Sequence, residues 1–389
     1  MGKDSLRVFL DIRSGSVGLA IVRFASNGIL KDVPEVIFCI RKHLPFIQKS
    51  KNERLLSTTI NVVREVLITG RKHVQKDFKE VHVTFGPPWY FYETQTIKHA
   101  SEKETICDKN WFKKIADSEV EAFISRNFHN RKPDIIEKTL LRATLNGYET
   151  SSPLTGAAKE YEFTFYISAV ESSTTNSIRG SISEILGISE VKMHTMAPLC
   201  LSAVLFIFEG VVKQYMVVDL GNEITEFFLV RDELIITSFS IPYGQHSVIK
   251  EISKDLRVSP TVAQSIYKSY LDGVLISTHK YMVENSLKRA RGLWADLTVT
   301  ALRDISAQYI LSSVIILVGM KENSNFYKSV LEGKELGDIF PKQNPLDIRI
   351  LVAEDLKLKS GTTVTGGKLD LFLAMEISSI DKSDRFKYP

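Results

Sequence analysis

Two segments about two hundred residues apart repeat one pattern of hydrophobic and polar positions. Val8–Leu10 leads into Asp11, small and polar residues follow, and a second apolar segment then begins. Met216–Val218 leads into Asp219 and continues in the same way. Each copy predicts two strands joined by a tight turn, with a carboxylate at the edge of the turn. The repetition indicates two related half-molecules that face a shared cleft.

The rest of the chain alternates between strand and helix patterns, which indicates an α/β protein. Apolar or alternating runs predict strands at 36–40, 81–85, 94–99, 135–145, 161–170, 234–241 and 311–319. Apolar positions at helical spacing predict helices at 55–67, 108–127, 172–186 and 196–208, and further helices between 246 and 310. No Gly/Ser linker separates these elements, so we expect a molecule of several closely packed lobes.

These elements predict a division of the chain into two lobes and one insertion. A small α+β insertion with its own sheet is expected at 88–160, because a new run of strands and one helix interrupts the first lobe there. The full division is a first lobe at 1–87 and 161–205, the insertion at 88–160, a second lobe at 206–365 with a helical part at about 250–305, and a C-terminal helix with a polar tail at 366–389 that closes the first lobe.

Composition narrows the class of protein. A net charge of +4 over 389 residues is mild and is no signature of nucleic-acid binding. The three cysteines are far apart and form no CxxC pair, so neither a disulfide framework nor a zinc site is expected. The longest uncharged apolar stretch, 196–208, is shorter than the roughly 20 residues that span a membrane. We therefore expect a cytoplasmic protein.

The two predicted turns carry the candidate chemistry. Small residues in a turn leave backbone N–H groups free to bind a phosphate, and a carboxylate at a strand end can hold Mg²⁺ through water. Asp11 and Asp219 are the candidate magnesium-facing residues. The candidates for phosphate contact are Ser14, Gly15, Ser16, Gly221 and Thr225. The alternative is that each aspartate only favours a turn at the end of a strand.

The order and spacing of these motifs resemble the actin-like ATPase superfamily, in particular FtsA-type cell-division proteins and, second, PilM-type pilus-assembly proteins. Segment 11–16 is similar to the first phosphate motif of the superfamily, and segment 219–226 is similar to the second. Segments 146–148, 153–157, 197–199 and 241–244 extend the resemblance to FtsA. The resemblance implies a duplicated actin-like, ribonuclease H-like fold of two lobes with an SHS2-like insertion, and ATP with Mg²⁺ in the cleft. It also places Gly319 at the turn on the adenosine side.

Several positions depart from the motifs of that superfamily. Arg13 replaces a glycine of the first turn, and Asn222 and Glu223 replace two glycines of the second. Met320 follows Gly319 where further glycines would admit adenosine. A glutamate in the phosphate turn also places negative charge beside phosphate, which is unfavourable without a compensating ion. ATP and Mg²⁺ are therefore doubtful cofactors, and we predict weak or absent ATP binding and hydrolysis.

The resemblance leaves two classes of function open. The first is a scaffold or assembly protein of cell division or pilus assembly, whose partners would be a tubulin-like division filament or the cytoplasmic tail of a membrane protein, with self-association possible and no nucleic acid. The second is a Mg-ATP-dependent ATPase or small-molecule kinase, for which the sequence offers no convincing carboxylate base. The tail at 381–389 is too short and polar for an amphipathic anchor, so recruitment to the membrane is expected through a partner.

Two further patterns have ordinary interpretations. The basic clusters at 41–54 and 288–291 are read as solvated helix faces. Segment 361–368 superficially resembles a phosphate-binding loop, but Leu369 stands where a hydroxyl would hold magnesium, so a turn before the last helix is predicted.

Overall fold

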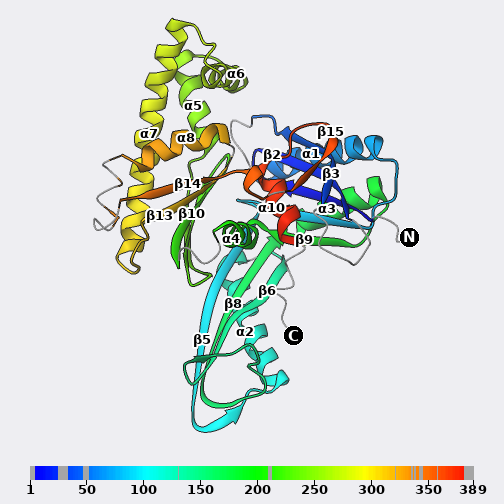
Figure 1. Cartoon of the computed structure of the whole chain (residues 1–389), viewed down its shortest axis with the longest axis vertical. Coiled ribbons are helices and arrows are strands. Elements are labelled where there is room, and N and C mark those ends of the chain that lie inside the picture. The colour runs from blue at the N-terminus through cyan, green and yellow to red at the C-terminus, as the bar shows by residue number, and fades with distance from the viewer. Residues whose placement is uncertain are drawn as a thin grey trace.

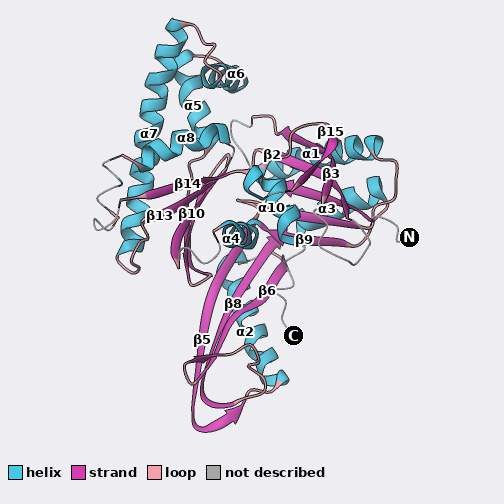
Figure 2. Ribbon diagram, viewed as in Figure 1, coloured by secondary structure: helices cyan, strands magenta, loops and turns pink. Residues whose placement is uncertain are grey.

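Two sheets of the same strand order form the body of the molecule, and a third sheet extends from them (Figure 1). The structure is a computed structural model that describes residues 5–24, 34–46, 52–129, 131–208, 213–319, 321–333, 336, 339–340, 345–356 and 358–380. Figure 2 shows helices against the sheets of both lobes and a separate group of helices at one end.

The first lobe has a six-stranded sheet of order β15-β3-β2-β1-β4-β9. Its strands are β1 (Ser5–Ile12), β2 (Ser16–Phe24), β3 (Glu35–His43), β4 (Glu80–Phe85), β9 (Val191–Thr195) and β15 (Lys359–Thr365). Its helices are α1 (Asn52–His73), α3 (Ser172–Leu186), α4 (Met196–Ile207) and α10 (Leu371–Ile380). Successive side chains of β1 point to opposite faces of the sheet and pack in different hydrophobic clusters. Val8 and Leu10 pack with residues of α1, whereas Phe9 packs with Leu373 and Ile377 of α10.

The second lobe repeats this topology in a five-stranded sheet of order β12-β11-β10-β13-β14. In both lobes an antiparallel hairpin, β1–β2 or β10–β11, lies beside a parallel neighbour of its first strand. The strands are β10 (Gln214–Leu220), β11 (Thr225–Arg231), β12 (Leu234–Ile241), β13 (Val314–Val318) and β14 (Asp347–Leu351). The helices are α5 (Gln245–Leu256), α6 (Pro260–Leu271), α7 (Ser277–Ser306) and α8 (Lys321–Leu331), and a 3-10 turn covers Ala353–Leu356. The predicted duplication is thus observed strand by strand.

The insertion is a four-stranded antiparallel sheet of order β5-β8-β6-β7 with helix α2 packed on it. Its elements are β5 (Tyr90–Ile106), α2 (Lys109–Phe128), β6 (Pro133–Leu145), β7 (Tyr148–Glu149) and β8 (Ala157–Glu171). Aromatic side chains such as Phe112, Phe123 and Phe163 fill its own core. The predicted limit at residue 160 falls inside β8, because this strand crosses the whole insertion before it enters α3.

Several elements differ from the sequence prediction. Strands β7, β9, β14 and β15 were not predicted, because each is short and stabilised by pairing with a distant strand rather than by its own pattern. Residues 361–365, predicted as part of a turn, lie in β15, which pairs with β3 of the first lobe. The turn follows only at Gly366, whose φ is +99°. No helix within the described residues has the length and apolarity needed to cross a bilayer.

Candidate functional site

The two repeated hairpins face each other, and their turns are in direct contact. A Cβ atom on Gly15 would lie only 2.3 Å from Cγ of Asn222, so the backbone of the first turn rests against a side chain of the second. Asp11 and Asp219 are the second-last residues of β1 and β10, and both carboxylates are fully buried. The structure therefore brings the two predicted turns into contact.

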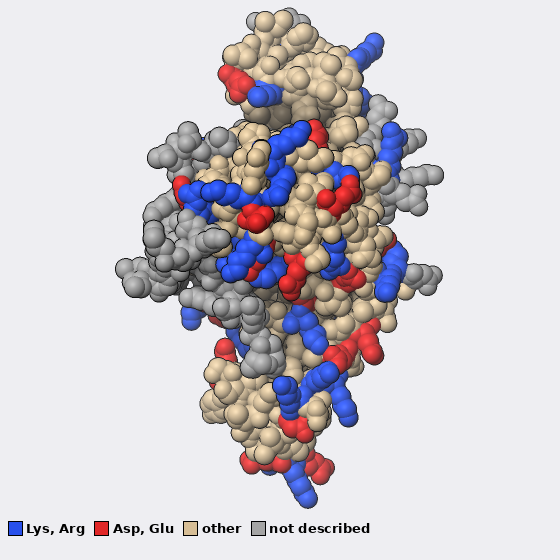
Figure 3. Space-filling view, turned by 90° about the vertical axis from the view of Figure 1, so that its right-hand side faces the viewer, with Lys and Arg blue, Asp and Glu red and all other residues tan. Residues whose placement is uncertain are grey.

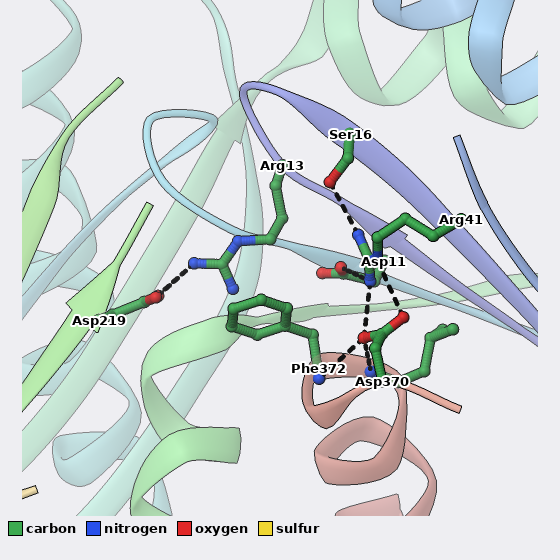
Figure 4. A network of polar contacts seen from close by, with 8 residues as sticks. Asp11, Arg13, Ser16, Arg41, Asp219, Asp370 and Phe372 are labelled. Atoms are coloured by element: carbon green, nitrogen blue, oxygen red, sulfur yellow. Dashed lines mark hydrogen bonds and ion pairs between the residues drawn. The ribbon is translucent and has the colours of Figure 1, made fainter. Parts of the chain in front are cut away.

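Arg13 connects the two lobes at this point. One terminal nitrogen of its guanidinium, Nη2, lies 2.5 and 2.6 Å from the two carboxylate oxygens of Asp219 (Figure 4). The side chains of Arg13 and Asp219 are 2% and 0% exposed, respectively. The guanidinium carbon also lies 3.6 Å from the centre of the Phe372 ring, which comes from α10. Arg13 therefore occupies the space between the hairpins as a cation bound on two sides.

A second arginine neutralises the other aspartate. Nη2 of Arg41, on β3, donates to Asp11 at 2.6 Å, and the same guanidinium binds Asp370 at 2.8 and 2.9 Å. It also donates to the Ser16 hydroxyl at 3.0 Å. Asp370 in turn accepts from the backbone N–H of Phe372 at 3.0 Å, at the start of α10. This network joins three separate parts of the first lobe beneath the cleft (Figure 4).

Two glutamates lie behind the aspartates and are shifted toward their neutral forms. Burial raises the pKa of Glu226 to about 8, the negative charge of Asp219 adds to this, and Tyr90 donates to Glu226 at 3.1 Å. Burial raises the pKa of Glu376, on α10, well above its ordinary value, and the nearby Asp11 adds to the effect. Burial also raises the pKa of Asp11 above its ordinary value, although the positive charges of Arg41 and Arg13 oppose this shift.

The predicted phosphate-contact residues are largely engaged within the protein. The Thr225 hydroxyl donates to the carbonyl of Tyr243 at 2.7 Å and accepts from Nε1 of Trp294 at 3.2 Å. The backbone N–H of Gly221 donates to the Ile224 carbonyl at 3.1 Å. Ser16 accepts from Arg41, whereas the buried Ser14 hydroxyl has no hydrogen-bond partner in the described part of the chain.

The residues that replace motif glycines point to helix α5. Glu223 lies 2.7 Å from Nδ1 of His246 and 3.8 Å from the ammonium of Lys250, so Lys250 supplies a cation to this carboxylate. The amide of Asn222 lies 3.4 Å from His246. Gly319 follows β13 and lies against Leu220, where a Cβ would approach to 2.9 Å. Met320 lies outside the described residues.

The site does not fit Mg²⁺ with a nucleoside triphosphate. Magnesium requires carboxylates that are free to hold its water shell, whereas both aspartates are bound to guanidinium groups. Among the described residues, no group of three or more His, Cys, Asp or Glu side chains could hold a metal ion. Asp11 Oδ1, Arg13 Nη1 and Ser14 Oγ are buried without partners there, a mixed set of acceptor, donor and hydroxyl that suits water better than a polyanion.

The sequence missed most of the groups that fill the cleft. Arg41 was read as part of a solvated helix face, but it lies in β3 with a side chain only 9% exposed. A Cβ on Gly18, its partner across the hairpin, would lie 2.5 Å from Arg41 Nη2, so the pairing of a glycine with an arginine was the available signal. Asp370 and Phe372 gave no signal, because they lie 329 or more residues away from the arginines that they contact.

Comparison with solved structures identifies the fold. No protein-family model matches the chain, and no curated protein sequence is significantly similar to it. The structure of the PilM–PilN type IV pilus biogenesis complex matches with a TM-score of 0.62 at 10% identity, over 89% of this chain and 88% of that chain. EutJ, the ethanolamine utilization protein of Carboxydothermus hydrogenoformans, matches with a TM-score of 0.46 at 11% identity, over 90% of this chain and 85% of that chain. The chain therefore shares the fold of PilM in that complex, which agrees with the actin-like fold predicted from the sequence.

Removal of Arg13 should strongly destabilise the protein. The Arg13→Ala variant leaves the buried carboxylate of Asp219 without its cation, so we expect the free energy of unfolding to fall by about 3–5 kcal/mol. Arg23→Ala is the control, because the Arg23–Glu35 pair is 37% and 36% exposed and its loss should cost under about 1 kcal/mol. Urea unfolding measures both values. Equal losses for the two variants would contradict a buried ion pair.

Glu226 should make stability depend on pH. Its carboxyl has a folded pKa of about 8 and an ordinary value of 4.5, so the folded state keeps a proton that the unfolded state releases between these values. The stability of the wild type should therefore fall as pH rises from about 4.5 to 8, and level off above that range. Glu226→Gln cannot ionise, so its stability relative to the wild type should rise across the same window. Urea titrations at pH 5, 7 and 9 measure the stability of both proteins. If the stabilities of the wild type and of Glu226→Gln change in parallel with pH, the pKa of Glu226 is not raised.

Proposed function

We propose that this protein is an assembly or scaffold protein of the FtsA/PilM kind that does not turn over ATP. The observation that carries the proposal is the Arg13–Asp219 pair, which puts a protein cation where the resemblance expects a magnesium-bound phosphate. The Arg41–Asp11 pair does the same for the other lobe. In this proposal the lobes are held together by side chains of the chain itself, and no nucleotide is needed to close the cleft.

The energetics of the cleft support this proposal. Entry of Mg-ATP would have to separate Arg13 from Asp219 and move both turns apart, because Gly15 lies against Asn222. Breaking one buried pair leaves an uncompensated charge at a cost of about 3–5 kcal/mol. Binding energy spent on this opening is lost from affinity, so an ordinary micromolar nucleotide site is not expected.

Calorimetric titration with Mg-ATP should give no binding in the micromolar range. The same titration of the Arg13→Gly/Arg41→Ala double variant distinguishes a nucleotide site that is only blocked from one that has been lost. A blocked site should recover affinity for Mg-ATP when both cations are removed. Micromolar affinity of the wild type that disappears in Asp11→Ala and Asp219→Ala would overturn the proposal and favour the ATPase or kinase alternative.

A groove beside the insertion supports a role in binding a protein partner. Strand β6 pairs with β8 along one edge, but its other edge meets only the two-residue strand β7 at Thr144 and Leu145 within the described structure. The groove next to this edge has a volume of about 390 Å³. Its apolar lining residues come from β6, β9, α4 and the start of β12, namely Ile136, Leu141, Met193, Pro198, Leu199, Leu201 and Ile235.

The partner that suits this groove is an extended peptide segment with apolar side chains. An unpaired strand edge supplies backbone donors and acceptors to such a segment, and the apolar walls can take alternate side chains. The Glu137 carboxylate accepts hydrogen bonds from the backbone N–H of Thr195 at 3.0 Å and from the Thr195 hydroxyl at 2.5 Å. These bonds hold β6 against the first lobe. The groove therefore has rigid walls on both sides.

The biological role that we propose follows from these two features. The protein would act in the cytoplasm and hold either the cytoplasmic tail of a membrane protein, as in pilus assembly, or a tubulin-like filament, as in cell division. The similar solved structure is a PilM–PilN type IV pilus biogenesis complex, which favours the first of these roles for the present chain.

A photo-crosslinking amino acid tests the groove directly. Placed at Leu141, which lines the groove, it should capture a partner in cells of the source organism, whereas the same group at Ile68, 41% exposed on α1, should not. The captured segment, identified by mass spectrometry and made as a peptide, should bind the wild type at least tenfold more tightly than Ser202→Arg, which introduces a bulky cation into the groove. Equal binding by the two proteins would contradict the assignment of the groove.

A further inference from the structure

The junction between α6 and α7 presents apolar side chains to solvent. Val274 is 72% exposed, Ile276 66% and Tyr281 68%, and Leu271 at the end of α6 is 40% exposed. All four lie in the connecting segment, at the end of α6 or in the first turns of α7. Isolated exposed apolar residues are common in proteins, but a sequence-continuous group of this exposure marks an interaction site.

The local backbone holds this group outward. The N–H of Asp272 donates to the Lys268 carbonyl, that of Gly273 to Tyr270, and that of Val274 to Ser269. Gly273 has a φ of +73°, the left-handed conformation that ends a helix. The turn is therefore built by its own hydrogen bonds, and Val274 and Ile276 project from an ordered support.

The apolar junction lies at one end of the molecule. The longest axis is vertical in Figure 1, and the upper end is formed by α6 and the beginning of α7. The face turned to the viewer in the space-filling view is rounded and mostly tan at this end, and it carries a few charged side chains of both signs (Figure 3). A convex surface of this kind is suited to entering another medium, whereas a peptide or small ligand requires a concave site.

Two lysines and two acidic residues flank the apolar junction. The side chains of Lys268 and Lys280 are exposed, and neither forms an ion pair within the described structure. Asp272 and Glu284 are the acidic residues of the same stretch. The larger helical region, residues 245–306, carries nine Lys or Arg against six Asp or Glu, so its net charge is positive. Apolar side chains flanked by lysines are the features with which peripheral proteins bind an anionic bilayer.

We propose that the α6–α7 junction docks on the surface of an anionic lipid bilayer. Val274 and Ile276 would enter the boundary between headgroups and acyl chains, and Tyr281 would lie at headgroup level because its ring is apolar and its hydroxyl is polar. Lys268 and Lys280 would contact anionic headgroups. This docking adds a direct contact to the recruitment through a partner that the sequence led us to expect, and it does not depend on the state of the cleft.

Vesicle co-sedimentation tests the proposal. The full-length wild type should bind vesicles of equal phosphatidylglycerol and phosphatidylcholine, and bind pure phosphatidylcholine vesicles much more weakly. Val274→Ser combined with Ile276→Ser should lower the affinity for the anionic vesicles at least about tenfold, because two apolar side chains lose their burial. Lys268→Gln with Lys280→Gln should weaken binding and reduce its dependence on salt.

Ile310→Ser is the matched control, because Ile310 is 73% exposed but lies beyond the other end of α7. It should bind vesicles like the wild type, and unchanged thermal unfolding should show that every variant is folded. The proposal is overturned if the wild type does not bind anionic vesicles, or if the Val274/Ile276 variant binds them like the wild type. It is also overturned if that variant loses only self-association in sedimentation velocity, which would identify the junction as an interface between copies of the chain.

Discussion

A buried ion pair between the two lobes is the constraint on which the arrangement of this molecule depends. Arg13 is tied to Asp219 by contacts of 2.5 and 2.6 Å, and neither side chain is more than 2% exposed. A buried charge that loses its partner is strongly unfavourable, so the two hairpins cannot separate without a large cost. Two further contacts are consistent with this closed state. Gly15 lies against Asn222, and the Arg13 guanidinium lies over the ring of Phe372, at the start of α10.

Two of the residues that replace motif glycines act together, because both take part in ion pairs within or beside the cleft. A long cation at position 13 fills the space that a glycine would leave for phosphate, and Glu223 turns away to pair with His246 and Lys250. Raised pKa values of Glu226 and Glu376 limit the number of negative charges around the two arginines. Each aspartate of the repeated motif is thus paired with a guanidinium of the protein, which supports our proposal that protein groups alone close the cleft.

The two binding surfaces that we propose lie away from the cleft. The groove at the free edge of β6 is built where the insertion meets the first lobe, and Glu137 fixes its geometry through Thr195. The apolar junction of α6 and α7 lies at the far end of the helical region (Figure 1). Two separated surfaces would suit the connecting role that we propose, whereas an ATPase of this fold would need lobes that open and close.

The sequence by itself determined the duplicated α/β architecture, the positions of Asp11 and Asp219, and the loss of the glycines that admit phosphate. These features are local, because a strand–turn–strand pattern and a residue type can be read from a few neighbouring positions. Only the tertiary structure decided what fills the cleft. Arg41 and Asp370 are 329 residues apart, and β15 becomes a strand because it pairs with β3 across the chain. Long side chains reach partners that no local pattern specifies. The tertiary structure therefore decided which side chains pair with the two aspartates, and with them the closed state.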